Sequence, residues 1–303
     1  MMAVMQVHTI DLRFRNRARA IASFLVEGPD GFILIETGPE SCRETLLREL
    51  ASRQIKPEEI AAVFVTHIHL DHAGSAGWWA GQGVPVHVHP KGAKHLVDPE
   101  RLEASARQVY GEQFDELWGA MVPAPEECIV AVANDELIEV AGLQLRTLET
   151  PGHCFHHHAY QLDDVIFAGD AAGAKIDHSD FISVTSAPPQ FHLEHTLSSI
   201  GHLSARGPKS LYLTHFGEVE NPGPHLNSYR DAVELNALFV QQRLAEGMDA
   251  EALRVAYEAF QMEQAFRAQI PSEVWSTLQE INGTAMCADG IRLYWEKLTD
   301  HRA

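Results

Sequence analysis

The stretch Thr66-His67-Ile68-His69-Leu70-Asp71-His72-Ala73-Gly74 gathers four potential metal ligands directly after an apolar run, residues 60–65. The apolar run predicts a buried strand, so the cluster is expected at one edge of a sheet, where layered α/β folds place their ligand sites. His67 and His69 are two residues apart and therefore point the same way from extended backbone. Asp71 and His72 follow where the chain must turn, so their side chains can diverge towards a second point.

The side-chain types in this stretch indicate a metal site. Neutral imidazole and carboxylate are ligands that zinc prefers, and iron and manganese also accept them. A polar loop with chance histidines is a poorer explanation, because four ligand-type residues at a strand end have no structural purpose of their own.

The pattern His67-x-His69-x-Asp71-His72 resembles the signature of the metallo-β-lactamase superfamily, and three later stretches resemble its other ligand motifs in the same order. These stretches are Thr150-Pro151-Gly152-His153, Phe167-Ala168-Gly169-Asp170 and Leu213-Thr214-His215-Phe216-Gly217. The resemblance implies an αββα sandwich, in which two mixed β-sheets pack face to face and are flanked by helices.

The resemblance also implies a ligand set for two divalent metal ions, with zinc expected first and iron or manganese as alternatives. One ion would be bound by His67, His69 and His153, a second by Asp71, His72 and His215, and Asp170 would lie between them. Asp71 and His72 are also the residues expected to take part in catalysis.

This ligand set predicts a metal-dependent hydrolase. Two cations a few Å apart share a water and lower its pKa, and the resulting hydroxide can attack an ester, thioester, lactone or related bond. The alternative is an oxidoreductase of the persulfide-dioxygenase type with one iron, because its ligands of two His and one Asp are a subset of this set. A metal-binding protein without turnover is a third interpretation. Cys154 has no partnered base in view and is interpreted as structural.

Neighbouring histidines complicate the second motif and the strand after the metal loop. His157 falls where the superfamily often has a further histidine beside the site, whereas His156 and His158 are expected to be bystanders. His87 and His89 alternate along a predicted strand and match no ligand position.

Composition narrows the substrate and the compartment. The net charge of −19 opposes a phosphate backbone, so we expect a small-molecule substrate and no nucleic acid. The four cysteines form no C-x-x-C pair, which favours a reducing compartment. No signal peptide or membrane span is recognised, and a cytoplasmic protein is expected, with a homo-oligomer left open.

The substrate class cannot be narrowed by motif. The glutathione-binding residues of glyoxalase II enzymes find no match in the C-terminal residues 221–303 of this sequence. The lactonases of the superfamily carry a tyrosine just beyond the bridging aspartate, whereas Ala171-Ala172-Gly173-Ala174 follows Asp170 here. The cysteine ligand of many true β-lactamases is also missing. The sequence resembles most the uncharacterised bacterial hydrolases of the superfamily.

Patterns before the last motif predict further elements of the catalytic domain. Residues 21–27 and 32–36 predict a hairpin that ends at Glu36, where the superfamily usually carries an aspartate that supports the metal loop. Residues 130–140 and 143–148 predict another strand pair, broken at Ala141-Gly142.

The last part of the sequence differs in character from the rest. Asn221-Pro222-Gly223-Pro224 predicts a linker or a sharp boundary, and helical periodicity follows it. We therefore expect a catalytic domain over residues 1–220 and a helical C-terminal lobe over 221–303 that borders the active site.

Overall fold

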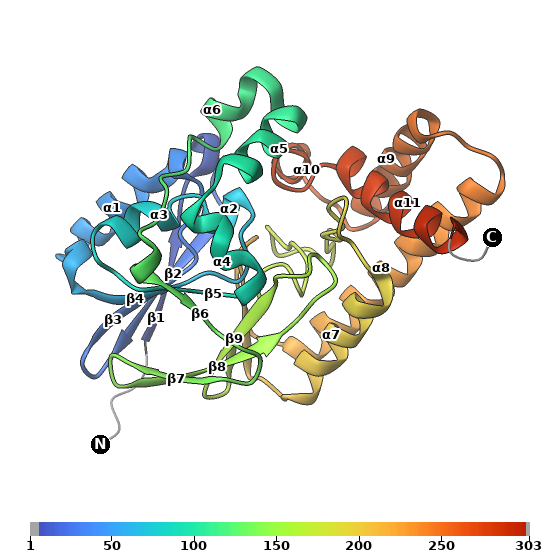
Figure 1. Ribbon diagram of the computed structural model, residues 1–303. Coiled ribbons are helices and arrows are strands. Elements are labelled where there is room, and N and C mark those ends of the chain that lie inside the picture. The colour runs from blue at the N-terminus through green and yellow to red at the C-terminus, as the bar shows by residue number, and fades with distance from the viewer. Residues whose placement is uncertain (1–5, 301–303) are drawn as a thin grey trace.

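Two six-stranded β-sheets pack face to face in the computed structural model, which describes residues 6–300 (Figure 1). The first sheet has the order β1(Gln6–Asp11), β2(Ala22–Gly28), β3(Gly31–Ile35), β4(Ile60–Phe64), β5(Val86–Val88), β6(Ile129–Ala131). The second has the order β12(Gly217–Val219), β11(Ser210–Leu213), β10(Val165–Phe167), β9(His158–Leu162), β8(Leu143–Glu149), β7(Leu137–Val140). Both sheets contain parallel and antiparallel neighbours and are therefore mixed.

Alternation along the strands decides which side chains fill the space between the sheets. In β10, Phe167 faces the first sheet while its neighbour Ile166 faces outward into a second core. Phe167 and Tyr212 of the second sheet pack against Phe24 of the first, with ring centroids 5.5 and 5.4 Å away. Aromatic packing of this kind joins the two sheets along their shared face.

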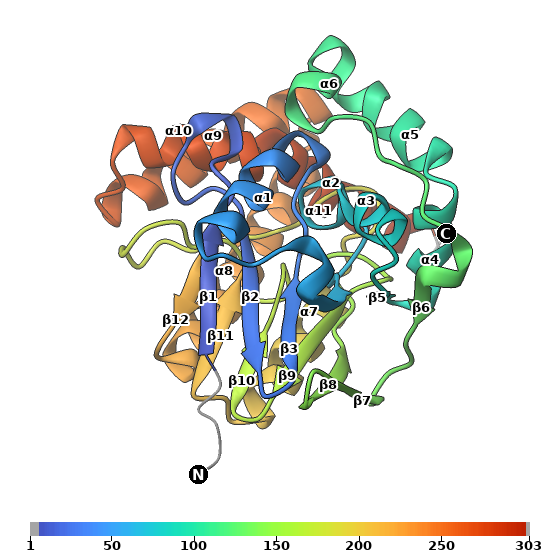
Figure 2. The same ribbon diagram turned by 90° about the vertical axis from the view of Figure 1, so that its left-hand side faces the viewer.

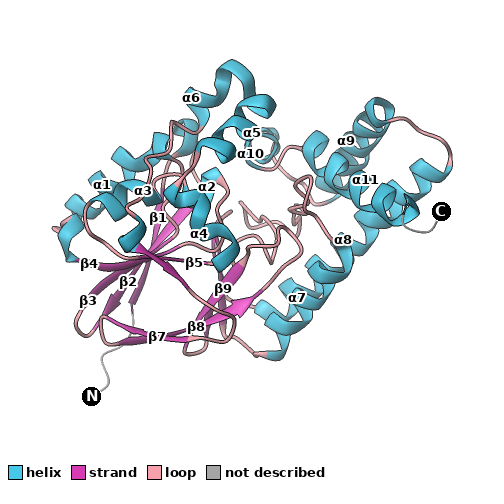
Figure 3. Ribbon diagram, viewed as in Figure 1, coloured by secondary structure: helices cyan, strands magenta, loops and turns pink. Residues whose placement is uncertain are grey.

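Helices lie outside both sheets (Figures 1 and 3). Those associated with the first sheet are α1(Arg43–Ser52), α2(Leu70–Ala73), α3(Ala76–Gly81), α4(Pro90–Val97), α5(Glu100–Tyr110) and α6(Phe114–Leu117). Those associated with the second sheet and the C-terminal region are α7(Leu193–Ala205), α8(Pro222–Ala245), α9(Ala250–Arg267), α10(Ser272–Ile281) and α11(Thr284–Asp300). Figure 2 shows β1, β2 and β3 in front of the second sheet. The expected αββα sandwich with additional C-terminal helices is confirmed.

Two expected elements differ in the structure. Residues 130–140 do not form one strand, because the chain leaves the first sheet after β6 and enters the second at β7. The turn between them contains Asp135 with a positive φ of 59°, a conformation that aspartate tolerates. The proline-rich cluster is not a linker either, since Asn221 is the N-cap of α8 and Pro222 its first residue, where proline needs no hydrogen-bond donor.

The C-terminal helices share hydrophobic cores with the rest of the chain. Tyr229, Val233 and Val240 of α8 pack in the outer core of the second sheet, together with Ile166 and Leu211. The division into two domains at residue 220 stays a prediction. Over residues 6–300, none of the helices has the length and apolarity needed to cross a membrane. All four cysteines are free thiols.

Candidate metal centre

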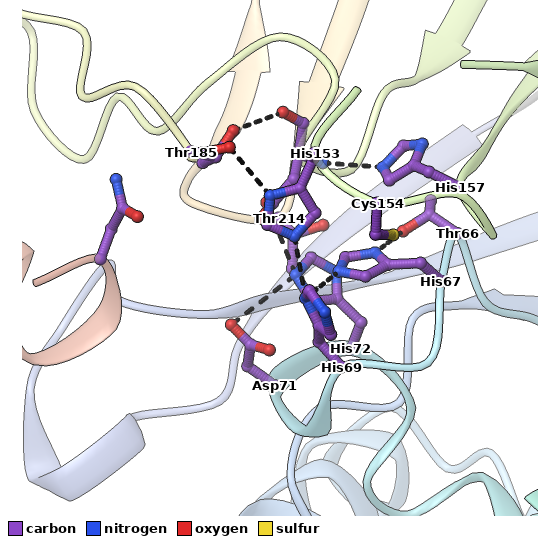
Figure 4. Close-up of polar contacts among 12 residues, drawn as sticks. Thr66, His67, His69, Asp71, His72, His153, Cys154, His157, Thr185 and Thr214 are labelled. Atoms are coloured by element: carbon purple, nitrogen blue, oxygen red, sulfur yellow. Dashed lines mark hydrogen bonds and ion pairs between the residues drawn. The ribbon is translucent and has the colours of Figure 1, made fainter. Parts of the chain in front are cut away.

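The residues predicted to bind metal lie close together: Figure 4 shows His67, His69, Asp71, His72 and His153, and Asp170 and His215 lie 3.5 Å from His72 and 3.3 Å from Asp71. His67, His69, Asp71 and His72 follow β4, His153 follows β8, Asp170 follows β10 and His215 follows β11. His69 and Asp71 are half-buried, and the other members are buried. The half-buried pair therefore marks the side from which solvent or substrate can approach.

Three imidazoles converge in a first group. Nδ1 of His69 lies 3.0 Å from Nε2 of His67 and 2.8 Å from Nε2 of His153. The outer nitrogen of His153 donates to the carbonyl oxygen of Thr185 at 2.9 Å, because a carbonyl can only accept. Nε2 of His153 is then the unprotonated nitrogen, with its lone pair directed at the group. A buried set of converging lone pairs is the arrangement that a cation stabilises.

A second group consists of Asp71, His72 and His215. Oδ2 of Asp71 lies 3.3 Å from Nε2 of His215 and 3.7 Å from Nε2 of His72. Nδ1 of His215 donates to the carbonyl oxygen of Ala20 at 2.8 Å, which leaves Nε2 facing the carboxylates of Asp71 and Asp170. The ring orientation and the tautomer are thus fixed from outside the group.

Asp170 lies between the two groups. Its Oδ2 is 3.4 Å from Nε2 of His153, and its Oδ1 is 3.5 Å from Nε2 of His72 and 3.7 Å from Nε2 of His215. Within the described part of the chain, Nε2 of His72 and Oδ1 of Asp170 are buried without a hydrogen-bond partner. Orphaned buried polar atoms need an explanation, and this donor set suits divalent metal ions. The residues present therefore fit such ions.

Electrostatics distinguish the two groups. Burial, followed by the neighbouring imidazoles, holds the pKa values of His67 and His69 well below their usual range, so both are neutral. Burial also opposes the charged form of His72. The carboxylates of Asp71, Glu36 and Asp170 outweigh it and raise the pKa of His72 to about 10. The second group therefore attracts a positive charge, from a proton or from a cation.

Glu36 connects the loops that carry these groups. Its buried carboxylate accepts hydrogen bonds from the hydroxyl of Thr66 at 2.5 Å, from Nδ1 of His72 at 2.9 Å and from the hydroxyl of Thr214 at 3.1 Å. Its backbone is in the left-handed region, with φ 63°. Although the superfamily usually has an aspartate here, Glu36 reaches the support position.

The remaining histidines occupy different environments. Nε2 of His157 accepts from the backbone N–H of Asp170 at 3.1 Å, so this residue contacts the site as expected. His87 stacks on Phe64 with ring centroids 4.4 Å apart, and His89 accepts from the backbone N–H of Lys91 at the start of α4. The ring of His158 lies 4.5 Å from that of His89 in a tilted arrangement. None of these three belongs to a described group with ligand spacing.

Some contacts at the site could not be found from the sequence. The backbone carbonyl of Thr185 accepts a hydrogen bond from His153. The side-chain hydroxyl of Thr185 donates a hydrogen bond to the carbonyl oxygen of Asp170 at 2.7 Å. The Thr185 hydroxyl in turn lies 3.1 Å from the hydroxyl of Tyr229 in α8. Sγ of Cys154 also joins the first group, since all ligand-type atoms of that set lie within 4.8 Å of one another. In the sequence, the only indication of a role for Cys154 is its position directly after His153.

Comparison with known proteins agrees with the geometry of the site. The sequence model of the metallo-beta-lactamase superfamily matches residues 16–215. The chain belongs to the metallo-β-lactamase superfamily. The match contains every residue of the two groups and ends at His215.

Relatives in this superfamily are distant. A metallo-beta-lactamase fold-containing protein, ST1585 of Sulfurisphaera tokodaii, is 25% identical over 166 residues, which are 54% of this chain and 62% of the relative. An N-acyl homoserine lactonase of Bacillus cereus is 28% identical over 227 residues, 64% of this chain and 79% of the lactonase. A hydroxyacylglutathione hydrolase of Shewanella pealeana is 26% identical over 37% of this chain and 33% of its own length. The first and last of these are matched over less than two thirds of their length.

Solved structures of the superfamily show the fold alone, because their sequences are too different. Metallo-beta-lactamase family protein TTHA1429 from Thermus thermophilus superposes with a TM-score of 0.67 at 20% identity, covering 99% of this chain and 94% of that one. The structure of ST1585 gives 0.66 at 19% identity, covering 94% and 98%. The alignment with TTHA1429 extends over nearly the whole of this chain.

Proposed function

We propose that this chain is a hydrolase that uses two divalent metal ions, with zinc expected first and iron or manganese as alternatives. The observation that carries the proposal is the position of Asp170, whose two carboxylate oxygens face different histidine groups. One ion would be held by His67, His69 and His153 and the other by Asp71, His72 and His215. Bound there, the ions would acidify a shared water and polarise the substrate oxygen.

The residues of the chain prepare this chemistry in several ways. The carbonyl oxygens of Thr185 and Ala20 hold the imidazoles of His153 and His215 in one tautomer. Burial of both groups strengthens their interaction with charge that develops in the transition state. The half-buried Asp71, with His72 next to it, lies on the accessible side and is proposed to act in catalysis.

The substrate is proposed to be a small molecule with an electrophilic acyl group. Two of the relatives named above are a lactonase and a hydroxyacylglutathione hydrolase, whose names describe cleavage of acyl bonds. The net charge of −19 makes nucleic acid a poor substrate. Thioesters and lactones are therefore the first compounds to test, followed by β-lactams and phosphodiesters.

Metal content tests the proposal most directly. Purified protein is expected to carry close to two metal ions per chain by elemental analysis. Asp170→Ala should lower both occupancies and the hydrolysis rate, whereas His72→Ala and His215→Ala should mainly empty the second position. His202→Ala, which changes an exposed histidine of α7, is the matched control.

The one-iron alternative makes the opposite prediction. A persulfide dioxygenase would contain a single iron, and His72→Ala and His215→Ala would leave most of it bound. One iron per chain, together with oxygen uptake on a persulfide and no hydrolysis, would overturn the hydrolase proposal.

A further inference from the structure

Cys154 is part of the first histidine group, although it belongs to none of the four sequence motifs that carry the ligand set. It directly follows His153 in the chain, and its side chain is completely buried. Its Sγ and the ligand-type nitrogens of His67, His69 and His153 all lie within 4.8 Å of one another (Figure 4). Ligand atoms on one tetrahedral zinc lie about 3 to 4 Å apart, given bonds of about 2.0 to 2.3 Å. The spacing of the four atoms is therefore only slightly wider than that of the ligands of one ion.

The direction of approach leaves room for a substrate. His69 is half-buried and marks the accessible side of the group, whereas Cys154 is completely buried. A buried ligand leaves the side at His69 and Asp71 open to a substrate. Nδ1 of His156 lies 3.3 Å from Sγ and can donate to a sulfur that has lost its proton.

We propose that Cys154 supplies a fourth protein ligand to the metal ion held by His67, His69 and His153. This inference rests on the proposed metal centre and specifies its ligand chemistry. When the ion binds, the S–H bond breaks, the proton leaves to solvent, and a sulfur lone pair forms the bond to the metal. Thiolate is a soft ligand, so the first position selects zinc, cobalt or iron over manganese.

The competing explanation assigns Cys154 to packing only. In that case the thiol keeps its proton and donates a hydrogen bond to Nδ1 of His156. The metal ion then contacts nitrogen and oxygen atoms alone. The two explanations differ in whether sulfur is bonded to metal, which a spectrum reports without any need for a substrate.

Substitution with Co²⁺ distinguishes them. The metal-depleted full-length chain is titrated with Co²⁺, and its absorption is recorded from the near-ultraviolet through the visible range. Thiolate bound to Co²⁺ gives an intense near-ultraviolet charge-transfer band, whereas imidazole and carboxylate ligands give only the weaker visible bands. We expect the charge-transfer band in the wild type and in Cys42→Ser, a matched change of a buried cysteine outside the site. The band should be lost in Cys154→Ser while the visible bands remain.

The results separate this inference from the function on which it rests. Visible cobalt bands without a charge-transfer band in the wild type would show a metal centre that lacks sulfur, and would overturn the role of Cys154 alone. A charge-transfer band that persists in Cys154→Ser would overturn it as well. Failure of the folded wild-type chain to bind Co²⁺ at all would overturn the metal centre and this inference together.

Discussion

The carboxylate of Glu36 is the residue-scale contact that joins three parts of the metal centre. It accepts hydrogen bonds from Thr66 after β4, from His72 in α2 and from Thr214 after β11. Hydrogen bonds to a charged acceptor are about twice as strong as neutral ones, so this one side chain orients both sides of the second group.

Glu36→Gln tests that role. The amide keeps the size of the side chain but removes the charge and one acceptor, so His72 loses its charged partner. We expect metal affinity to fall about 10- to 100-fold, measured by competition with a chromogenic chelator. Glu27→Gln, an exposed change on β2, should leave affinity unaltered. Equal affinity in both variants would show that Glu36 only fills space.

His158 gives the protein a sensitivity to acid that is independent of the metal. Its side chain is buried, and burial followed by the nearby His89 lowers its pKa to about 3. The unfolded chain binds this proton near pH about 6.5. Because the folded-state pKa is the lower one, the stabilisation is complete above pH about 6.5 and is lost as the pH falls towards 3.

The variant His158→Phe should lose part of the dependence of the free energy of unfolding on pH. Each pH unit within this window costs about 1.4 kcal/mol for one proton. Urea unfolding at pH 7.5 and 5.5, with chelator present, should therefore show an acid loss about 1 kcal/mol smaller in the variant. If the free energy of unfolding depends on pH in the same way in both proteins, His158 is not a source of the acid sensitivity.

Residues adjacent in the chain were the predictable part of the site. The first motif follows a strand, and the later motifs each carry a ligand-type side chain, so their convergence was implied by the resemblance to the superfamily. The support from Thr185 could not, because it depends on how a loop of low periodicity crosses the site. The proximity of Cys154 to three imidazoles likewise depends on side-chain direction rather than on spacing.

At the scale of elements, the loop before α7 links the metal centre to the C-terminal helices. Its residues 183–186, here the bridging segment, receive hydrogen bonds from Asn282 at 2.8 Å to Ser183 and 3.0 Å to Val184. Thr185 within it contacts His153 and Asp170. The lobe therefore reaches the first histidine group through one short stretch of backbone.

Close packing of α11 on the bridging segment can be tested at Gly290. A Cβ at this glycine would lie 1.8 Å from the carbonyl oxygen of Ser186. Because this oxygen is a backbone atom, it cannot easily move away to relieve the overlap. We expect Gly290→Ala to destabilise the chain by about 1 to 3 kcal/mol in urea unfolding. Gly201→Ala in α7 is the control, since a Cβ there meets no described atom within 4 Å and alanine favours helix. A harmless Gly290→Ala would mean that α11 is free to shift.

Two elements show why local pattern was not sufficient. The apolar residues on either side of Asn134-Asp135-Glu136 have the same strand signal whether they stay in one sheet or lie in two. Proline at residue 222 can end one segment or begin a helix, and only the position of Asn221 as N-cap decides between them.

At the scale of the whole molecule, the C-terminal helices contribute to both hydrophobic cores. Leu278 and Ile281 of α10 pack in the core that contains the first sheet, and Tyr229 and Tyr257 pack in the outer core of the second. Arg17, in the loop before β2, also forms an ion pair with Glu280 at 2.6 Å. A lobe bound in this way is not expected to behave as a separate module.

Truncation after Gly223 should therefore affect the centre as well as the lobe. Removing the later helices uncovers the outer face of the second sheet and deprives Thr185 of Tyr229. We expect loss of the cooperative unfolding transition, or a folded fragment with lower metal content and a higher KM. A folded fragment with unchanged metal content and kinetics would establish the lobe as independent.

The bridging segment also sets an order of events during synthesis. Every residue of the two groups proposed to bind metal precedes residue 216, so the ribosome completes them before it makes the partners of this segment. Asn282 and Gly290 follow much later in the chain. A nascent chain would thus expose a full set of imidazoles and carboxylates before their supports exist. We expect stable loading with metal to follow release from the ribosome rather than to accompany translation.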